Sequence, residues 1–199
     1  MVEYKNSPND GVVPMRVYAR ESLIKYVNHE DIFKTTAHGM KFYKDLFGKQ
    51  YAFNKYDQIF VPELNYGGME NVACITFAEK LLHRDEAITI NKKMDQMLVV
   101  LHELAHQWFG NLVTMKWWND LWLNESFATY MSYMALSELK GQDDFSTVAW
   151  LGFLESKFGG IQDDSLETTH PVCSEIQTAD QADSAFDGIA YGKGASYLK

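Results

Sequence analysis

The sequence predicts an α+β fold, in which a short β-rich amino-terminal part precedes a helical part. Residues 12–19, 58–64 and 72–77 are rich in the branched and aromatic residues that strands favour. From residue 94 onward, apolar residues recur at helical spacing. Because strands come first and helices follow, with no linker or repeat between them, we expect one domain over residues 1–199.

The composition is that of a globular protein with a hydrophobic core. Of the 199 residues, 46% are hydrophobic and 23% are charged, which are ordinary values for a folded domain. The longest apolar run, Met97 to Leu101, is far too short to span a bilayer. Residues 1–10 are polar and lack the apolar centre of a secretory signal. We therefore expect no membrane span and a cytoplasmic protein.

Net charge and cysteine content restrict the possible partners. The formal charge of −9 argues against nucleic acid, because phosphate binding needs a basic face. It favours a cationic ligand, such as a peptide with a free ammonium group. Cys74 and Cys173 are too few for a disulfide framework, and we interpret them as two reduced thiols without a metal.

The first predicted elements are bounded by turn and cap residues. Asn9-Asp10-Gly11 is a turn signal ahead of the first strand. Residues 31–47 form a predicted helix, which Asp31 can cap and Gly48 can end. The segment 65–71, which joins two predicted strands, contains two glycines. These allow positive φ angles and a close approach of another backbone.

The later elements are helices separated by glycine or acidic residues. Residues 94–109 form the clearest helix, and Gly110 is its stop. The next predicted helix is capped by Asn119 or Asp120, runs to about Leu139 and stops at Gly141-Gln142. Another helix follows from Asp143 or Asp144 to Gly159-Gly160. A long loop over 161–187 then leads to a last helix over 188–199. Loops of that length within a domain are often functional.

The motif His-Glu-Leu-Ala-His at residues 102–106 is the strongest chemical signal. Residues four apart on a helix lie about 40° apart around its axis, so His102 and His106 can reach one ion. Glu103 points to the side of that pair, where it can contact a water without being a ligand. Catalytic zinc takes three protein ligands, and Glu125 on the next predicted helix is the candidate third ligand. We expect one Zn²⁺ per chain.

The alternative interpretation is a helix with two histidines and a glutamate on a partly solvated face. The motif lies among apolar residues, which indicates a helix that is buried almost all round. Buried histidines and carboxylates need partners, and a metal supplies one. We interpret the other histidines, at 29, 38, 83 and 170, as surface or loop residues. The tryptophans at 108, 117, 118 and 122 are interpreted as core residues.

Taken together, the motifs resemble the gluzincin zinc metallopeptidases of the aminopeptidase N type. The resemblance runs from about Val12 to the end of the chain. The matching stretches are His102-Glu103-x-x-His106 followed after 18 residues (107–124) by Glu125, Gly67-Gly68-Met69-Glu70-Asn71, Trp108 to Thr114, Trp117 to Glu125, and Tyr191-Gly192-Lys193-Gly194. The resemblance implies a thermolysin-like catalytic domain and hydrolysis of the N-terminal residue of peptides.

The resemblance also implies roles for particular residues. Glu103 would act as general base toward the attacking water, and Tyr191 would donate a hydrogen bond to the oxyanion. Glu70 would bind the free α-ammonium of the substrate. An internal peptide bond brings no such cation, so this role implies exopeptidase action. The neighbouring Gly67, Gly68 and Met69 would bind the peptide backbone as an added strand. Without the resemblance, Glu70 reads as a turn residue and Tyr191 as a core residue.

Two departures from the family pattern bear on the interpretation. Gly68 stands where the family more often has alanine, a change expected to keep the loop shape. Family members also carry a β-rich domain before the catalytic domain and a helical domain after it, and this chain matches neither. The chain is therefore interpreted as a fragment, a split gene product or a reduced paralogue that works beside other chains. Asp183 and Asp187 are candidates for an acidic side of the cleft.

Two other functions stay open at this stage. The chain could be a non-catalytic or reduced paralogue that acts as a structural or interaction subunit of a larger assembly. It could also use the same zinc site for another hydrolysis, such as epoxide opening. The carboxylate of Glu70 in its loop favours peptides over epoxides.

Overall fold

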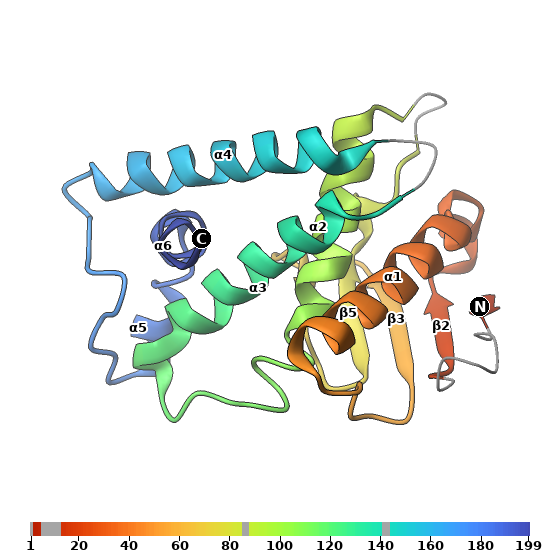
Figure 1. Cartoon of the computed structure of the whole chain (residues 1–199), viewed down its shortest axis with the longest axis horizontal. Helices are drawn as coiled ribbons and strands as arrows, with labels where there is room; N and C mark the ends of the chain where they lie inside the picture. The colour runs from red at the N-terminus through yellow and green to blue at the C-terminus, as the bar shows by residue number, and fades with distance from the viewer. Residues whose placement is uncertain (1, 5–12, 85–87, 141–143) are drawn as a thin grey trace. The chain divides into compact units, whose positions relative to one another are not determined.

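The computed structural model describes residues 2–4, 13–84, 88–140 and 144–199. The chain divides into two compact units, residues 1–111 and 112–199, and Figure 1 shows the elements of each. The predicted turn at Asn9-Asp10-Gly11, the predicted stop at Gly141-Gln142 and the predicted start at Asp143 lie outside the described residues. The single domain over 1–199 stays a prediction.

The first unit is built on a mixed β-sheet. The strands are β1 (Val2–Tyr4), β2 (Met15–Tyr18), β3 (Tyr56–Val61), β4 (Gly68–Met69) and β5 (Cys74–Ala78), in the order β1-β2-β3-β5-β4. β2, β3 and β5 run parallel to one another, whereas β1 and β4 pair antiparallel with β2 and β5 at the two ends. The two-residue strand β4 was not predicted, since it falls within the glycine-containing segment 65–71.

Helix α1 (His29–Phe47) provides the crossover between the parallel strands β2 and β3. A short 3-10 helix, η2 (Glu21–Tyr26), precedes it. The predicted cap Asp31 is wrong: the side chain of Asn28 accepts the backbone N–H of Asp31 at 3.3 Å, so the helix begins earlier than expected. Gly48 ends the helix as predicted, with a left-handed φ of 63° that favours glycine.

Helix α2 (Ile90–Ala105) begins and ends earlier than the predicted range 94–109. Thr89 caps its start by accepting the backbone N–H of Lys92 at 3.3 Å. α2 packs on α1 at Gly39, where an added methyl group would lie 2.6 Å from a Leu101 side-chain carbon. The buried Tyr43 hydroxyl of α1 donates to the Leu101 carbonyl of α2 at 3.0 Å. These contacts fix the helix that carries the histidine motif.

The second unit is helical. Its elements are the 3-10 turn η4 (Trp118–Asp120), α3 (Leu121–Ser137), α4 (Phe145–Asp164), α5 (Ala179–Asp183), the π-helical turn η5 (Ile189–Lys193) and α6 (Gly194–Leu198). Asp144 caps α4, as predicted, by accepting the backbone N–H of Ser146 at 2.9 Å. The predicted loop 161–187 contains the last turn of α4 and the whole of α5.

The predicted end of α4 at Gly159-Gly160 is wrong, because the helix continues to Asp164. Gly160 serves packing and does not stop the helix. A methyl group on Gly160 would lie 2.5 Å from both the Gly188 carbonyl oxygen and the Lys193 backbone nitrogen. The glycine therefore lets η5 approach the surface of α4 closely.

The fold is mixed α/β, with a small sheet and mostly helices. The predicted order of strands before helices holds only in part, since α1 lies between β2 and β3. Within the described residues, no helix is both long enough and apolar enough to cross a membrane.

Candidate functional site

The two histidines of the 102–106 motif lie together at the end of α2, His102 in its last turn and His106 at its C-cap. Their Nε2 atoms are 3.0 Å apart, and their ring centroids are 4.6 Å apart. His106 is buried and His102 is half-buried. The predicted approach of the two imidazoles is therefore present in the structure.

The hydrogen bonding of His106 prepares it to bind a cation. Its Nδ1 lies 3.2 Å from the carbonyl oxygen of Phe109, which can only accept a hydrogen bond. Nδ1 therefore carries the hydrogen, and the lone pair is on Nε2, facing His102. A tetrahedral ion with bonds of about 2.0–2.1 Å holds two nitrogen ligands about 3.3 Å apart. The two Nε2 atoms thus fit a zinc ion with little movement.

Glu103 is buried beside this pair. Its side chain lies against Gly68, where an added methyl group would be 2.6 Å from Oε1 of Glu103. An alanine at residue 68 would require the Glu103 side chain to shift, while the expectation that Gly68 keeps the loop shape stays a prediction. Single donor atoms of Glu70, Glu103 and His106 all lie within 4.8 Å of one another. Two carboxylates and an imidazole thus converge within the first unit.

Two polar side chains that follow the motif hold the segment of Glu70. The Glu70 carbonyl accepts from Nε2 of Gln107 at 3.1 Å and from Nδ2 of Asn111 at 2.7 Å. The buried Oε1 of Gln107 also accepts the backbone N–H of Ala73 at 3.1 Å. Sequence reasoning assigned no role to either side chain. Both follow His106 closely, and Asn111 also lies in the stretch Trp108 to Thr114 that resembles the family; these are the signals that the sequence offers.

The predicted substrate-binding residues lie on an edge strand. β4 contains Gly68 and Met69, which pair with Phe77 and Thr76 of β5. β4 is the last strand in the order of the described sheet, and Met69 is exposed. Gly67 packs against the side chain of Val99 on α2. An edge strand presents unpaired backbone groups, which is the arrangement that binding of an extended peptide requires.

Two predicted site residues lie in the second unit. Glu125 is buried on α3, and its Oε1 is 3.5 Å from Nδ2 of Asn124. Tyr191 is half-buried on η5, with its ring centroid 6.5 Å from that of Phe186. The role of Glu125 as third zinc ligand and that of Tyr191 as oxyanion donor stay predictions.

Other expectations met mixed outcomes. Trp108 is buried, as expected, and its Nε1 donates to the Lys49 carbonyl at 2.8 Å. Trp117 and Trp118 are 51% and 36% exposed, so their assignment to the core was wrong. The carboxylate of Asp187 accepts backbone N–H groups of Ile189 and Ala190, and its place beside the cleft stays a prediction.

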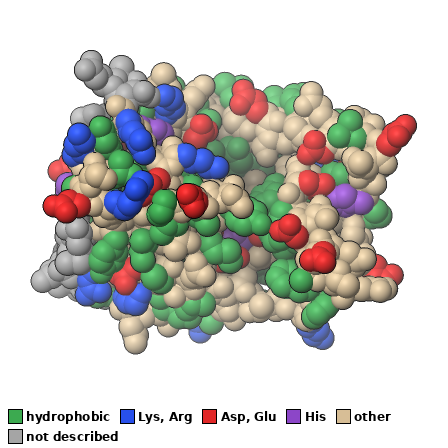
Figure 2. Space-filling model, turned by 180° about the vertical axis from the view of Figure 1, so that it is seen from behind, with side chains coloured by type: hydrophobic (Ala, Val, Ile, Leu, Met, Phe, Trp, Pro, Cys, Tyr) green, Lys and Arg blue, Asp and Glu red, His purple; other side chains and the backbone are tan. Residues whose placement is uncertain are grey.

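The excess of negative charge belongs mainly to the second unit. Residues 112–199 hold five of the 18 Lys and Arg and 13 of the 27 Asp and Glu, which is −8 of the total of −9. On the face shown in Figure 2, Lys and Arg gather in one part, and another part carries mainly Asp and Glu. An acidic unit attracts cationic ligands over distances of about a Debye length.

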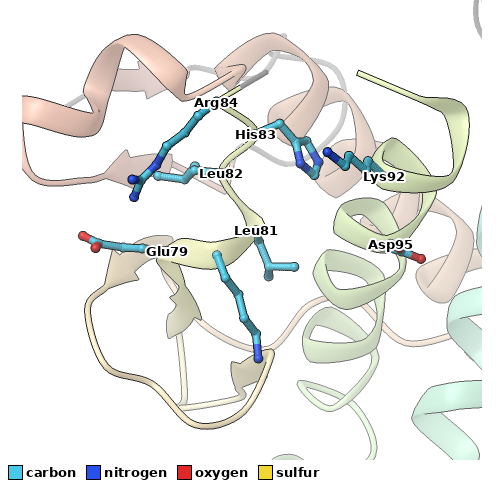
Figure 3. A pocket seen from close by; sticks show the side chains of 8 residues that line it. Glu79, Leu81, Leu82, His83, Arg84, Lys92 and Asp95 are labelled. Atoms are coloured by element: carbon cyan, nitrogen blue, oxygen red, sulfur yellow. The ribbon is translucent and has the colours of Figure 1, made fainter. Parts of the chain in front are cut away.

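A cavity of about 440 Å³ in the first unit lies apart from the predicted site residues. Figure 3 shows its lining, in which Lys92 and Asp95 come from α2. The lining residues are Glu79, Lys80, Leu81, Leu82, His83, Arg84, Lys92 and Asp95. None of them is a predicted ligand, base or substrate-binding residue, so the candidate site rests on the histidine motif and not on this cavity.

The sequence of this chain is similar to those of known proteins of one family. The model of the peptidase family M1 domain matches residues 32–199. Probable aminopeptidase 2 of Sulfurisphaera tokodaii is 48% identical over 161 residues, covering 80% of this chain and 20% of that protein. Aminopeptidase N of Streptomyces lividans is 41% identical over 188 residues, covering 94% and 22%.

A third relative bears a name that refers to interaction with a protease. Tricorn protease-interacting factor F2 of Thermoplasma acidophilum is 46% identical over 161 residues, covering 80% of this chain and 20% of that protein. The chain thus spans about a fifth of the length of these curated relatives. Since the family model matches most of the chain, with the paired histidines, Glu103 and Glu70 inside the matched region, the chain belongs to peptidase family M1.

Proposed function

We propose that this chain carries the active site of a zinc-dependent aminopeptidase that removes the N-terminal residue of peptides. The observation that carries the proposal is the convergence of two imidazoles and two carboxylates in one unit. The Nε2 atoms of His102 and His106 are 3.0 Å apart, and donor atoms of Glu70, Glu103 and His106 lie within 4.8 Å of one another. Family membership and the names of the relatives support the same activity.

His102, His106 and Glu125 would hold one zinc ion. A catalytic zinc site takes three protein ligands, and Glu125 is a buried carboxylate on the helix after the motif. When bound, zinc lowers the pKa of a water ligand and polarises the carbonyl group of the substrate. A thermolysin-like arrangement of the catalytic domain belongs to the same proposal.

Glu103 would act as the general base. Its buried carboxylate takes a proton from the attacking water and then passes it to the leaving amine. The contact with Gly68 restricts the positions that this carboxylate can occupy. Tyr191 would donate its phenolic hydrogen to the oxyanion that develops on the substrate carbonyl.

Glu70 would select for a free amino terminus. Its carboxylate pairs with the α-ammonium group of the peptide, and an internal peptide bond brings no such cation. The hydrogen bonds from Gln107 and Asn111 to the Glu70 carbonyl hold its backbone in place. Gly67, Gly68 and Met69 would bind the peptide backbone along the edge strand β4. The acidic second unit favours the approach of the cationic substrate.

A second candidate function is that of a structural or interaction subunit in a larger assembly. The name of two relatives, Tricorn protease-interacting factor F2, favours a role in an assembly. This role is compatible with catalysis, but a purely structural subunit would need neither zinc nor Glu103.

The test measures zinc content and hydrolysis together. We expect the purified chain to bind one zinc and to hydrolyse leucine p-nitroanilide, with activity lost on chelation and restored by zinc. Glu103→Gln should retain zinc and lose a factor of about 10²–10⁴ in kcat, as expected for loss of a general base. Glu155→Gln, at an exposed position on α4, is the matched control and should behave as wild type. A folded chain that takes up no zinc would refute the proposal, and a zinc-loaded but inactive chain would favour the structural subunit.

A further inference from the structure

Asp187 fixes the backbone at the start of the turn that carries Tyr191. Its Oδ1 accepts the backbone N–H of Ile189 at 2.9 Å and that of Ala190 at 3.0 Å. The Asp187 carbonyl accepts the N–H of Tyr191 at 3.0 Å. First-turn N–H groups have no partner within a helix, so this side chain determines how the chain enters η5.

The second carboxylate oxygen of Asp187 is held by His170. Nε2 of His170 lies 2.8 Å from Oδ2 of Asp187, and Nδ1 lies 2.8 Å from the carbonyl oxygen of Pro171. Both ring nitrogens therefore face oxygens that accept hydrogen bonds. Both contacts are satisfied only if each nitrogen carries a hydrogen, and this is the imidazolium form. Ser174, 3.2 Å from Nδ1, donates its own hydrogen to the Pro171 carbonyl.

The groups around His170 include some that raise its pKa and some that lower it. Burial opposes the charged ring, but the hydrogen bonds to Pro171 and Asp187 outweigh it, so the pKa of His170 lies above its ordinary value of 6.5. Lys193 on η5 opposes protonation, and Asp164 on α4 binds the Lys193 ammonium at 2.6 Å. The nearby Lys193 charge is thereby partly balanced.

We propose that His170 is a positioning residue for Tyr191. The protonated ring locks the Asp187 carboxylate in the rotamer that holds the turn of Tyr191, and loss of its proton breaks one of the two ring contacts. Its stabilising effect is therefore complete at low pH and lost as pH rises through the pKa of His170. The proposal rests on the proposed function only where Tyr191 is taken as the oxyanion donor. We expect that loss of His170 lowers kcat and does not raise KM.

The hydrogen-bonded pair can be tested without any activity. NMR of the zinc-loaded full chain should show a His170 ring that titrates above pH 6.5, and Asp187→Asn should lower that pKa by about one pH unit. In wild type, the amide signals of Ile189 and Ala190 should follow the same titration. A His170 pKa that Asp187→Asn leaves unchanged would overturn the pairing, as would amide signals that ignore the titration.

The link to Tyr191 needs a double-mutant cycle. We expect His170→Ala to lower kcat about tenfold with KM nearly unchanged, since small displacements of a catalytic group are costly. In the Tyr191→Phe background the same substitution should cost less than about twofold, because the group that it positions is gone. An equal loss in both backgrounds would show that His170 does not act through Tyr191. His29→Gln, at the start of α1, is the control and should leave kcat unchanged.

A conservative variant separates charge from hydrogen bonding. His170→Gln can still donate to Asp187 but cannot titrate, so its kcat should lose the alkaline decline that His170 imposes. Persistence of that decline would refute the role of the charge. If zinc-loaded wild type hydrolyses no peptide substrate, the proposed function fails, and the NMR titration alone then decides the His170–Asp187 pair.

Discussion

Replacement of Gln107 by leucine tests whether one buried amide organises the substrate-binding loop. Gln107 is 1% exposed and lies directly after the histidine motif. Its amide donates to the carbonyls of Glu70 and Glu103 at 3.1 and 3.4 Å and accepts from the N–H of Ala73 at 3.1 Å. Leucine has a similar volume and can make none of these bonds.

The magnitude follows from the groups that lose their partners. The Glu70 carbonyl keeps its bond from Asn111 at 2.7 Å, so it is not orphaned. The N–H of the buried Ala73 loses Gln107, the partner that the structure gives it, and an unsatisfied buried donor costs about 1–3 kcal/mol. With a further hydrogen bond lost at about 1 kcal/mol, we expect Gln107→Leu to lower the free energy of unfolding by about 2–4 kcal/mol. At a urea slope of about 2 kcal/mol/M, the midpoint falls by about 1–2 M.

The loop effect is separated from general destabilisation by Gln96→Leu. Gln96 is a buried glutamine on α2, the helix that precedes Gln107, and its Nε2 donates to the Leu81 carbonyl at 2.7 Å, outside the loop. We expect both variants to unfold at lower urea concentration. Only Gln107→Leu should reduce the preference for a free over an acetylated amino terminus, measured as a ratio of kcat/KM values. Equal ratios for the two variants, or an unchanged midpoint for Gln107→Leu, would refute the reasoning.

Two further predictions concern single side chains. Glu70→Ala should lower kcat/KM for peptides with a free amino terminus by about tenfold or more, because an ion pair at the substrate amine is lost. The value for acetylated peptides should not change. Equal effects on both substrates would show that Glu70 does not recognise the amine. Gly192→Ala should destabilise the chain by about 3 kcal/mol in thermal unfolding, because the added methyl would lie 2.1 Å from the Ser156 carbonyl oxygen. Gly159→Ala, where nothing lies within 4 Å, is its control on α4 and should raise stability by about 0.5–1 kcal/mol; a control destabilised as much as Gly192→Ala would rule out the steric clash as the cause.

The sequence predicted the elements that depend on local patterns. The histidine helix, the Gly48 end of α1 and the Asp144 cap of α4 each follow from periodicity or from one residue with a specific backbone role. The pairing of His102 with His106 was also predictable, because a helix fixes the relation between residues four apart. Such features depend on few neighbours, and all of these neighbours are close in sequence.

The errors came where tertiary contacts override local preference. Gly160 was predicted as a helix stop, yet it lies within α4. η5 approaches α4 there too closely for a side chain, which explains the glycine. The strand β4 has two residues and exists through its pairing with β5, which no periodicity can reveal. The hydrogen bonds of Gln107 to Glu70 and Ala73 connect residues more than 30 positions apart. A lone glutamine within a helix pattern gives no sign of such partners.

The two groups proposed to act on the substrate share a structural problem. Glu70 lies just after a two-residue strand and Tyr191 lies on a π-helical turn, so regular hydrogen-bond ladders hold neither backbone firmly. In both places, polar side chains supply the missing bonds: Gln107 for the loop and Asp187 for the turn. Because these bonds are few, losing one should displace a functional group as well as destabilise the fold. The side chains that hold the backbone should therefore affect kcat and substrate preference almost as strongly as the functional groups themselves.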